Sequence, residues 1–157
     1  MDKEMAENFR YSVRYWRLEQ GLTLSSLCVF DTNLRKLRYQ ADVPIIILSE
    51  LDYLTIRDAL KIPVKTLVKR PPECIPFLYP TNRRLIFEKL EEIRKAKGLT
   101  MKQINIAMGD ATGSKWSQII NKGAAPNDVT LYKACKALDV KLSDLATEVK
   151  NEQQGIS

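Results

Sequence analysis

The sequence predicts an all-α protein with two tandem modules of five short helices each, joined by a proline-rich connector. Three observations predict it. Apolar residues recur at helical spacing, a weak repeat relates the two halves, and four of the seven prolines fall within ten residues between them. The expected boundaries are 1–70 for the first module, 71–80 for the connector, 81–150 for the second module and 151–157 for a flexible tail.

Composition limits the class of protein. A chain of 157 residues can hold two modules of about 60 to 70 residues. Apolar residues make up 45% and charged residues 28%, which argues against wholesale disorder. The sequence contains no run of about 18 apolar residues, the length needed to span a membrane, and its polar N-terminus is unlike a signal peptide. We therefore expect a cytoplasmic protein without a membrane partner.

Metal and catalytic motifs are missing from the sequence. The chain has no histidine, and its three cysteines, Cys28, Cys74 and Cys135, lie far apart. The common zinc sites and the histidine-dependent triads both need residues that this chain lacks. No cofactor motif and no recognisable acid pair is present. We expect no metal, no cofactor and no enzymatic activity.

The charge of the chain favours a polyanionic partner. The formal net charge is +6, and the pI is near 9.2. Residues 1–77 carry 12 basic and 10 acidic side chains, whereas residues 78–157 carry 13 and 9. The excess is thus +2 and +4, so the second half is the more basic one.

Four prolines mark the connector. Because proline lacks a backbone donor and disfavours helix in the residue before it, the segment 71–80 is predicted to be semi-extended. Its apolar side chains predict that it packs against one or both modules; they are Ile75, Phe77, Leu78 and Tyr79.

A weak repeat relates the sequences on either side of the connector. Gly21-Leu22-Thr23 recurs as Gly98-Leu99-Thr100, and each copy follows an amphipathic stripe. The stripes are Phe9, Val13 and Trp16 in the first copy and Ile86, Leu90 and Ile93 in the second. Each glycine is expected to end a helix, and each threonine to cap the next one.

A second match closes each copy. Residues 59–67 align with residues 137–145, and each stretch predicts a helix, a turn and a last helix with Leu67 or Leu145 inward. The middle of the first copy departs from this pattern. Its apolar, β-branched run at 43–48 has no counterpart in the second copy and favours an extended segment as much as a helix.

The segment from Leu99 onward carries the most specific motifs. It has a Leu-Thr opening, Ile104, Gly109 at a turn, a helix over 114–121, an Asn-Lys-Gly exit, Pro126 and the ending Lys136-Ala137-Leu138-Asp139-Val140. Together these features resemble the lambda-repressor/Cro family of helix-turn-helix proteins over 82–147, and 6–69 resembles it more weakly. Two departures are the turn at 109–113, about two residues longer than usual, and Asn105 where the family has a small alanine.

The resemblance implies sequence-specific binding of double-stranded DNA in control of transcription, by a repressor of phage or mobile-element type. On the third helix, Trp116, Ile119 and Ile120 form an apolar stripe, at about 100° per residue. The opposite face is polar and is expected to contact bases through Ser114, Ser117, Gln118 and Asn121. The expected phosphate contacts are Thr100, Lys102, Gln103, Lys115 and Lys122.

A solvated face without function is the alternative interpretation of that surface. Such a face usually mixes glutamate with lysine, and this one has no acidic residue. In the first copy, a second DNA-contact face is expected at Asn33, Arg35, Lys36, Arg38, Tyr39 and Gln40. The alternative for that copy is a remodelled module that serves dimerisation.

The sequence is compatible with two arrangements on DNA and with one rival function. Two modules on one chain would bind neighbouring half-sites without dimerising, and a symmetric homodimer is the other arrangement. The rival function is a helix-turn-helix scaffold that binds a protein partner as an inhibitor or adaptor. It would use the apolar run at 45–48 if that run is exposed.

Overall fold

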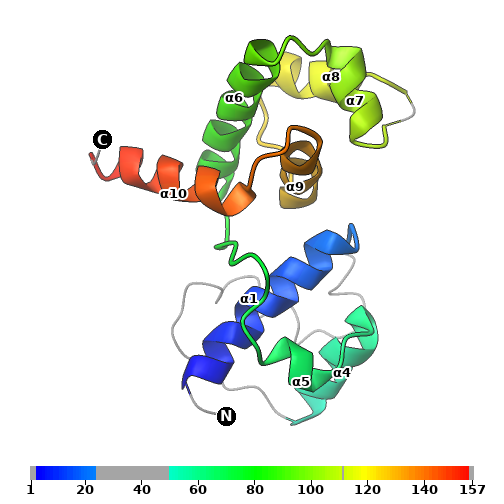
Figure 1. Cartoon of the computed structure of the whole chain (residues 1–157), viewed down its shortest axis with the longest axis vertical. Helices are drawn as coiled ribbons and strands as arrows, with labels where there is room; N and C mark the ends of the chain where they lie inside the picture. Colours follow the sequence, from blue (N-terminus) through cyan, green and yellow to red (C-terminus); the bar gives the residue numbers. More distant parts are fainter. Residues whose placement is uncertain (1–2, 24–49, 111, 156–157) are drawn as a thin grey trace. The chain divides into compact units, whose positions relative to one another are not determined.

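Helices make up the regular structure of the part of this protein that the structure describes. The computed structural model describes residues 3–23, 50–110 and 112–155, and in these ranges it contains no strand. Figure 1 shows the helices, which are α1 (Lys3–Glu19), α4 (Glu50–Leu60), α5 (Val64–Leu67), α6 (Pro80–Ala96), α7 (Met101–Ala107), α8 (Lys115–Lys122), α9 (Asp128–Ala137) and α10 (Leu142–Gln153). The predicted all-α class is confirmed. None of the helices in the described ranges is long and apolar enough to cross a membrane.

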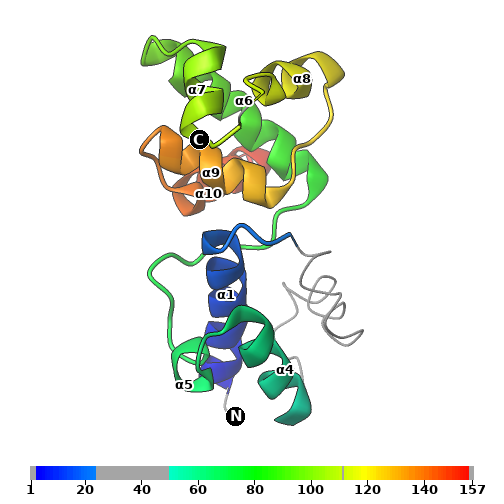
Figure 2. The same ribbon diagram turned by 90° about the vertical axis from the view of Figure 1, so that its right-hand side faces the viewer.

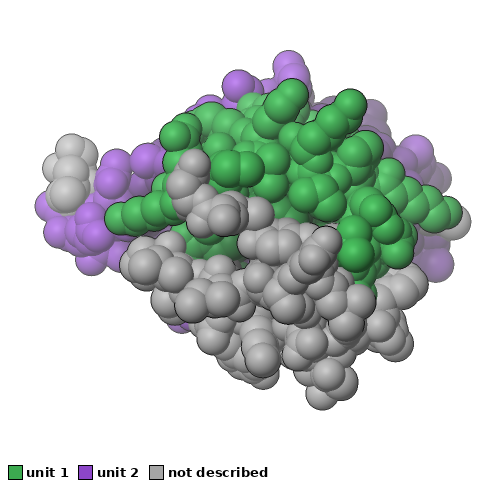
Figure 3. Space-filling view, turned by 90° about the horizontal axis from the view of Figure 1, so that it is seen from below, with its two compact units in different colours: residues 1–77 green, residues 78–157 purple. Residues whose placement is uncertain are grey.

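The chain divides into two compact units, residues 1–77 and 78–157, which Figure 3 colours separately. The boundary falls inside the expected connector. Two hydrogen bonds from α1 hold residues 69–75, just before this boundary. The Ser12 hydroxyl donates to the Lys69 carbonyl, and the Arg14 guanidinium donates to the Ile75 carbonyl, both at 2.5 Å. The prediction that the connector packs against a module is thus confirmed for the first unit. No helix forms between α5 and Pro80, as the prolines predicted.

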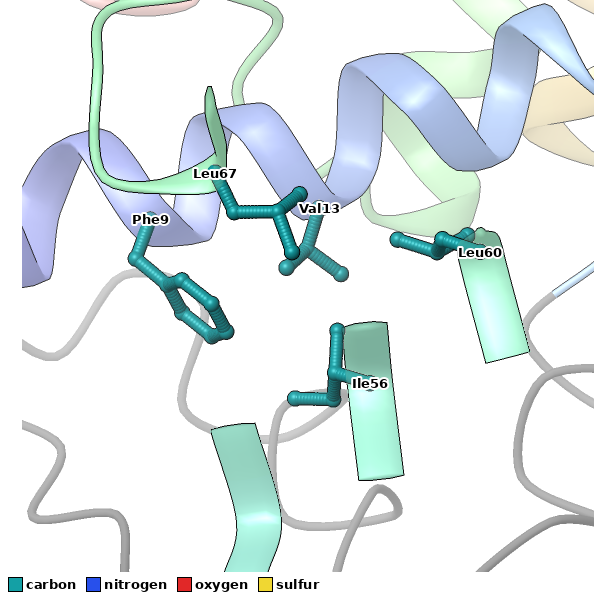
Figure 4. Packing of buried hydrophobic residues seen from close by; sticks show 5 residues of the cluster. All are labelled: Phe9, Val13, Ile56, Leu60 and Leu67. Carbon is teal, nitrogen blue, oxygen red and sulfur yellow. The ribbon is translucent and has the colours of Figure 1, made fainter. Parts of the chain in front are cut away.

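The core of the first unit lies between α1, α4 and α5 (Figure 4). Phe9 and Val13 come from α1, Ile56 and Leu60 from α4, and Leu67 from α5. Their side chains converge because each helix buries one stripe, and the predicted inward position of Leu67 is confirmed.

In the second unit, α6 packs against both α9 and α10, and α7 packs against both α8 and α9 (Figure 2). Pro80 occupies the first turn of α6, where its missing amide hydrogen costs nothing. Ile86 and Leu90 of the predicted stripe are fully buried, as is Trp116, and Leu145 is buried as expected.

The helix that opens each unit ends in the same way. Gly21 (φ 69°) and Gly98 (φ 70°) adopt left-handed backbone conformations, as predicted for glycines that end a helix. The next amide, of Leu22 or Leu99, donates back to the carbonyl five residues earlier, at 3.0 and 3.1 Å. The arginines that carry those carbonyls, Arg17 and Arg94, are both buried and donate to the carbonyls of Leu22 and Leu99.

A second pair of equivalent features lies near the end of each unit. Lys61 (φ 59°) and Asp139 (φ 57°) are the non-glycine residues with positive φ in the described chain. The carbonyl just before each accepts a side-chain hydrogen bond at 2.5 Å, Leu60 from Gln20 and Leu138 from Lys97. The core matches too. Each of the five residues of the first core has a buried counterpart 77 or 78 positions later, namely Ile86, Leu90, Ala134, Leu138 and Leu145.

Some sequence expectations differ from the structure or lie outside it. The predicted third helix starts one residue later, because Ser114 is the N-cap of α8. α10 continues to Gln153, so the expected tail begins three residues too early. The apolar run at 43–48 and the second contact face fall outside the described residues, and that face comprises Asn33, Arg35, Lys36, Arg38, Tyr39 and Gln40.

Candidate nucleic-acid interface

α7 begins with a capping box. The Thr100 hydroxyl accepts from the Gln103 amide at 3.1 Å, and the Gln103 side chain accepts from the Thr100 amide at 2.8 Å. The predicted cap is confirmed. Because these two side chains already satisfy two amides of the helix start, the N-terminus of α7 has fewer free donors for a phosphate than the sequence suggested. Lys102 is exposed on the same helix.

Asp110 organises the turn between α7 and α8. One carboxylate oxygen accepts from the Lys115 amide at 2.9 Å, and the other accepts from the Thr112 amide at 3.1 Å and its hydroxyl at 2.8 Å. The hydrogen bond from the Lys115 amide, followed by that from the Thr112 hydroxyl, holds the pKa of Asp110 below its usual value. Gly109 (φ 82°) supplies the positive φ that the chain needs to leave α7.

Asn105 ties α7 to both the turn and α8. Its side chain is fully buried. The amide nitrogen donates to the Gly113 carbonyl at 2.7 Å, and the amide oxygen accepts from the Trp116 backbone amide at 2.9 Å. The first two amides of α8 are therefore bonded to Asp110 and Asn105, and they are not open to an outside anion.

Trp116 seats α8 on α6. Its ring is fully buried, and its centroid lies 4.8 Å from that of Phe87. The prediction that Trp116 belongs to the core is confirmed. Its indole nitrogen donates to Glu91 at 2.5 Å, and Glu91 also forms an ion pair with the buried Arg94. The Arg94 hydrogen bond lowers the pKa of Glu91, against the opposing effect of burial.

Two arginines of α6 hold the exit from α8. Arg84 donates to the carbonyls of Ile119 at 3.3 Å and Ala124 at 3.5 Å. Arg83 donates to the Pro126 carbonyl at 2.8 Å. With Gly123 in the left-handed conformation (φ 65°), these contacts turn the chain away from α8 and fix its last turn.

The outward face of α8 presents most of the predicted contact residues. Lys115, Gln118, Asn121 and Lys122 are exposed. The two serines are half-buried, and their hydroxyls already have partners within the protein. Ser114 accepts from the Gln118 side chain at 3.2 Å and lies 3.0 Å from the Thr112 hydroxyl, while the Ser117 hydroxyl donates to the Met101 sulfur at 3.5 Å.

The basic side chains of α6 differ from those of α7 and α8 in their ion pairing. Every basic side chain of α6 contacts a protein acceptor; the residues are Arg83, Arg84, Lys89, Arg94 and Lys95. By contrast, Lys102, Lys115 and Lys122 make no ion pair with any described residue. The one acidic residue between positions 99 and 126 is Asp110, whose carboxylate is already bonded within the turn. This part of the surface is therefore positive.

Sequence reasoning missed the residues that position α8. They are Glu91, Arg94, Asp110 and Thr112, together with Asn105, which was noticed only as a departure. Asp110 carried a local signal, since an aspartate two residues before a threonine and five before a helix start is typical of such turns. Glu91 carried none, because its indole partner lies 25 residues away.

Other site types find little support in the described chain. No group of three cysteine, aspartate or glutamate side chains there is arranged to hold a metal ion. An open groove of about 300 Å³ lies between α6, α7 and α8, with Phe87, Met101 and Ile120 among its apolar lining residues. Its arginines pair with its own glutamates, so it adds no second basic surface.

Comparison of the chain with protein-family models, curated proteins and solved structures gave no match.

Proposed function

We propose that this chain is a regulator of transcription, of repressor type, that binds double-stranded DNA and reads its sequence with α8. One observation carries the proposal. The outward face of α8 combines exposed amide side chains with lysines that form no ion pair within the described part of the chain, and it carries no acidic residue. The other face of the helix is anchored by the buried Trp116. An α-helix with such a face fits the major groove of B-DNA.

Gln118 and Asn121 are the residues that we expect to contact bases. Each carries an amide that donates and accepts at once, which suits the N6 and N7 edge of adenine. Ser114 and Ser117 would support this reading less directly. Their hydroxyls are bonded to Gln118 and Met101, so they fix the neighbouring side chains as well as offering a weak contact of their own.

Lysine side chains would supply the phosphate contacts. Lys102, Lys115 and Lys122 are exposed and lack ion-pair partners among the described residues, so binding DNA would not require breaking a bond within the protein. Thr100 and Gln103 would contribute mainly by capping α7. The side-chain NH2 group of Gln103, which takes no part in the capping box, would be a donor to a phosphate.

We further propose that the first unit is a second, diverged module of the same kind. The matched helix ends, the matched left-handed residues and the matched core positions support a common origin of the two units. The face at Asn33 to Gln40 would then be the counterpart of α8.

The experiment that tests the proposal is a selection of bound sequences from random duplex DNA, followed by a salt titration of the winning duplex. A defined motif is expected. The logarithm of the affinity should fall linearly with the logarithm of the salt concentration, with a slope of about −0.9 for each phosphate neutralised.

Matched variants localise the interface. Lys115→Ala and Lys122→Ala should each reduce the magnitude of the salt slope by about one. Lys150→Ala is the control, because it removes the same charge from an exposed position on α10. Gln118→Ala and Asn121→Ala should weaken binding to the selected duplex much more than binding to unrelated DNA.

Two outcomes would overturn the proposal. One is the absence of any enriched motif, with weak binding of every duplex. The other is an equal effect of Lys150→Ala and Lys115→Ala, which would leave only the net charge of the chain as the cause of binding. A protein partner would then be the function to pursue.

A further inference from the structure

Asn105 occupies a position that ordinary packing does not explain. It is a polar side chain at the end of a short helix, and it is fully buried. A buried amide costs about 1 to 3 kcal/mol if it is left without partners, so its hydrogen bonds determine whether the site is tolerated. Both ends of this amide are used.

The two bonds of Asn105 lead to the two segments that determine where α8 lies. Its nitrogen bonds to the carbonyl of Gly113, at the end of the turn. Its oxygen bonds to the amide of Trp116, in the first turn of α8. One rigid side chain thus spans from α7 to both the turn and the helix start, whereas a small apolar residue would contact neither.

The turn between α7 and α8 is long, which explains why the bridge formed by the two Asn105 hydrogen bonds is needed. Residues 109–113 make a longer turn than the resemblance to known helix-turn-helix proteins predicts, and longer loops fix the angle between two helices less firmly. Asp110 secures the first amide of α8 from the solvent side, at Lys115. Asn105 secures the second from the buried side, at Trp116.

We infer that Asn105 is a positioning residue that sets the orientation of α8 and thereby its discrimination between DNA sequences. The inference rests on the proposed DNA-binding function. Loss of the bridge would leave the lysines able to contact phosphates and would misalign Gln118 and Asn121 with the bases. Specific affinity falls in that case, and non-specific affinity persists.

The test compares three variants of the full chain. Asn105→Ala removes both bonds, Asn105→Asp keeps the shape, and Asn151→Ala makes the control change on α10. Binding is measured to the duplex selected by the wild-type protein and to an unrelated duplex. Asn105→Ala should lower the ratio of the two affinities at least tenfold, and Asn151→Ala should leave it unchanged. A merely structural role would lower the folded fraction and reduce both affinities alike.

Asn105→Asp adds a rescue that depends on protonation. A neutral carboxylic acid has the donor and acceptor of the amide, whereas a buried carboxylate cannot donate to the Gly113 carbonyl. Burial raises the pKa of such an acid, so specific binding of Asn105→Asp should recover as the pH falls from about 8 to about 5.5. The charged groups that border these contacts are Asp110, Lys115 and the Glu91–Arg94 pair. The two native acids have lowered pKa values and stay ionised over this range.

Exchange of the Trp116 backbone amide with solvent provides a measurement without DNA. It should be faster in Asn105→Ala than in the wild-type protein. If the wild-type protein discriminates between duplexes but Asn105→Ala leaves the exchange rate or the affinity ratio unchanged, the inference about Asn105 is overturned. The proposed DNA-binding function is not affected by that result. A wild-type protein that selects no duplex would overturn the proposed function, and the inference with it.

Discussion

Glu91 links α6 to α8 through the buried Trp116. It accepts from the Trp116 indole and pairs with Arg94, and its side chain is only 16% exposed. Glu91→Ala would leave the buried Arg94 without its ion-pair partner, and we expect a loss of about 3 kcal/mol in the free energy of unfolding. Urea denaturation followed by fluorescence in a Trp16→Phe background, where Trp116 is the one remaining tryptophan, measures it. Glu92→Ala, on the exposed side of α6, should cost less than about 0.5 kcal/mol.

The same pair predicts a dependence of stability on pH. Because the folded-state pKa of Glu91 is lowered, its contribution is fully present above the unfolded value of about 4.3 and is lost as the pH falls through the folded value. The stability difference between the wild-type protein and Glu91→Ala should stay constant from about pH 5 to pH 8 and shrink below about pH 4. A difference that grew on acidification would contradict the lowered pKa.

Thr100 allows capping to be separated from phosphate contact. Thr100→Asp keeps an N-cap acceptor, since aspartate caps at least as well as threonine, and should leave stability within about 0.5 kcal/mol of the wild-type value. Its negative charge would repel a nearby phosphate, so DNA affinity should fall at low salt. Thr100→Ala should show the reverse pattern, with a loss of about 1 kcal/mol in stability and a smaller loss of affinity. Equal DNA affinity of the two variants would place Thr100 away from the phosphates.

At the scale of elements, periodicity and helix-ending glycines predicted much of the described fold. The stripes of α1 and α6 were visible because helix spacing repeats locally, and Gly21 and Gly98 mark the ends of these helices. Contacts across long sequence separations were not visible. Arg84 reaches Ala124 over 40 residues, and no local pattern encodes such a bond. The polar face of α8 could be predicted, whereas of the residues that orient it only Asp110 had a local sequence signal.

The left-handed residues that follow Leu60 and Leu138 give a prediction for matched elements. An L-residue pays about 1 to 2 kcal/mol in this conformation, and aspartate tolerates it better than lysine does. Glycine relieves this strain but also raises the entropy of the unfolded chain, which offsets part of the gain. Lys61→Gly should therefore stabilise the first unit by about 0.5 to 1 kcal/mol. Asp139→Gly should stabilise the second unit by less. Denaturation curves of both variants test this. Lys65→Gly, the same change within α5, should instead destabilise by about 1 kcal/mol.

At the scale of the whole molecule, the two units share structural features but differ in net charge. Equivalent helix ends and core positions recur, while the excess of basic residues is +2 in residues 1–77 and +4 in residues 78–157. The weak sequence repeat indicated these shared features, because the spacing of core residues and the helix-ending glycines can be compared directly between the two halves. Shared structural features do not imply a shared binding surface, so the two units need not contact the same DNA sequence even if they have the common origin that we propose.

If both units bind DNA, the selected motif should contain two unlike elements about one helical turn apart, bound by one chain. Inserting about five base pairs between them would place them on opposite faces of the duplex, and we expect at least a tenfold loss of affinity because the second contact no longer forms. Substituting Arg35 and Arg38 by alanine should relax discrimination at one element and leave the other intact. Two identical inverted elements bound by two chains would instead establish a symmetric dimer. Sedimentation of the complex with the selected duplex measures the stoichiometry and so distinguishes two modules on one chain from one module on each of two chains.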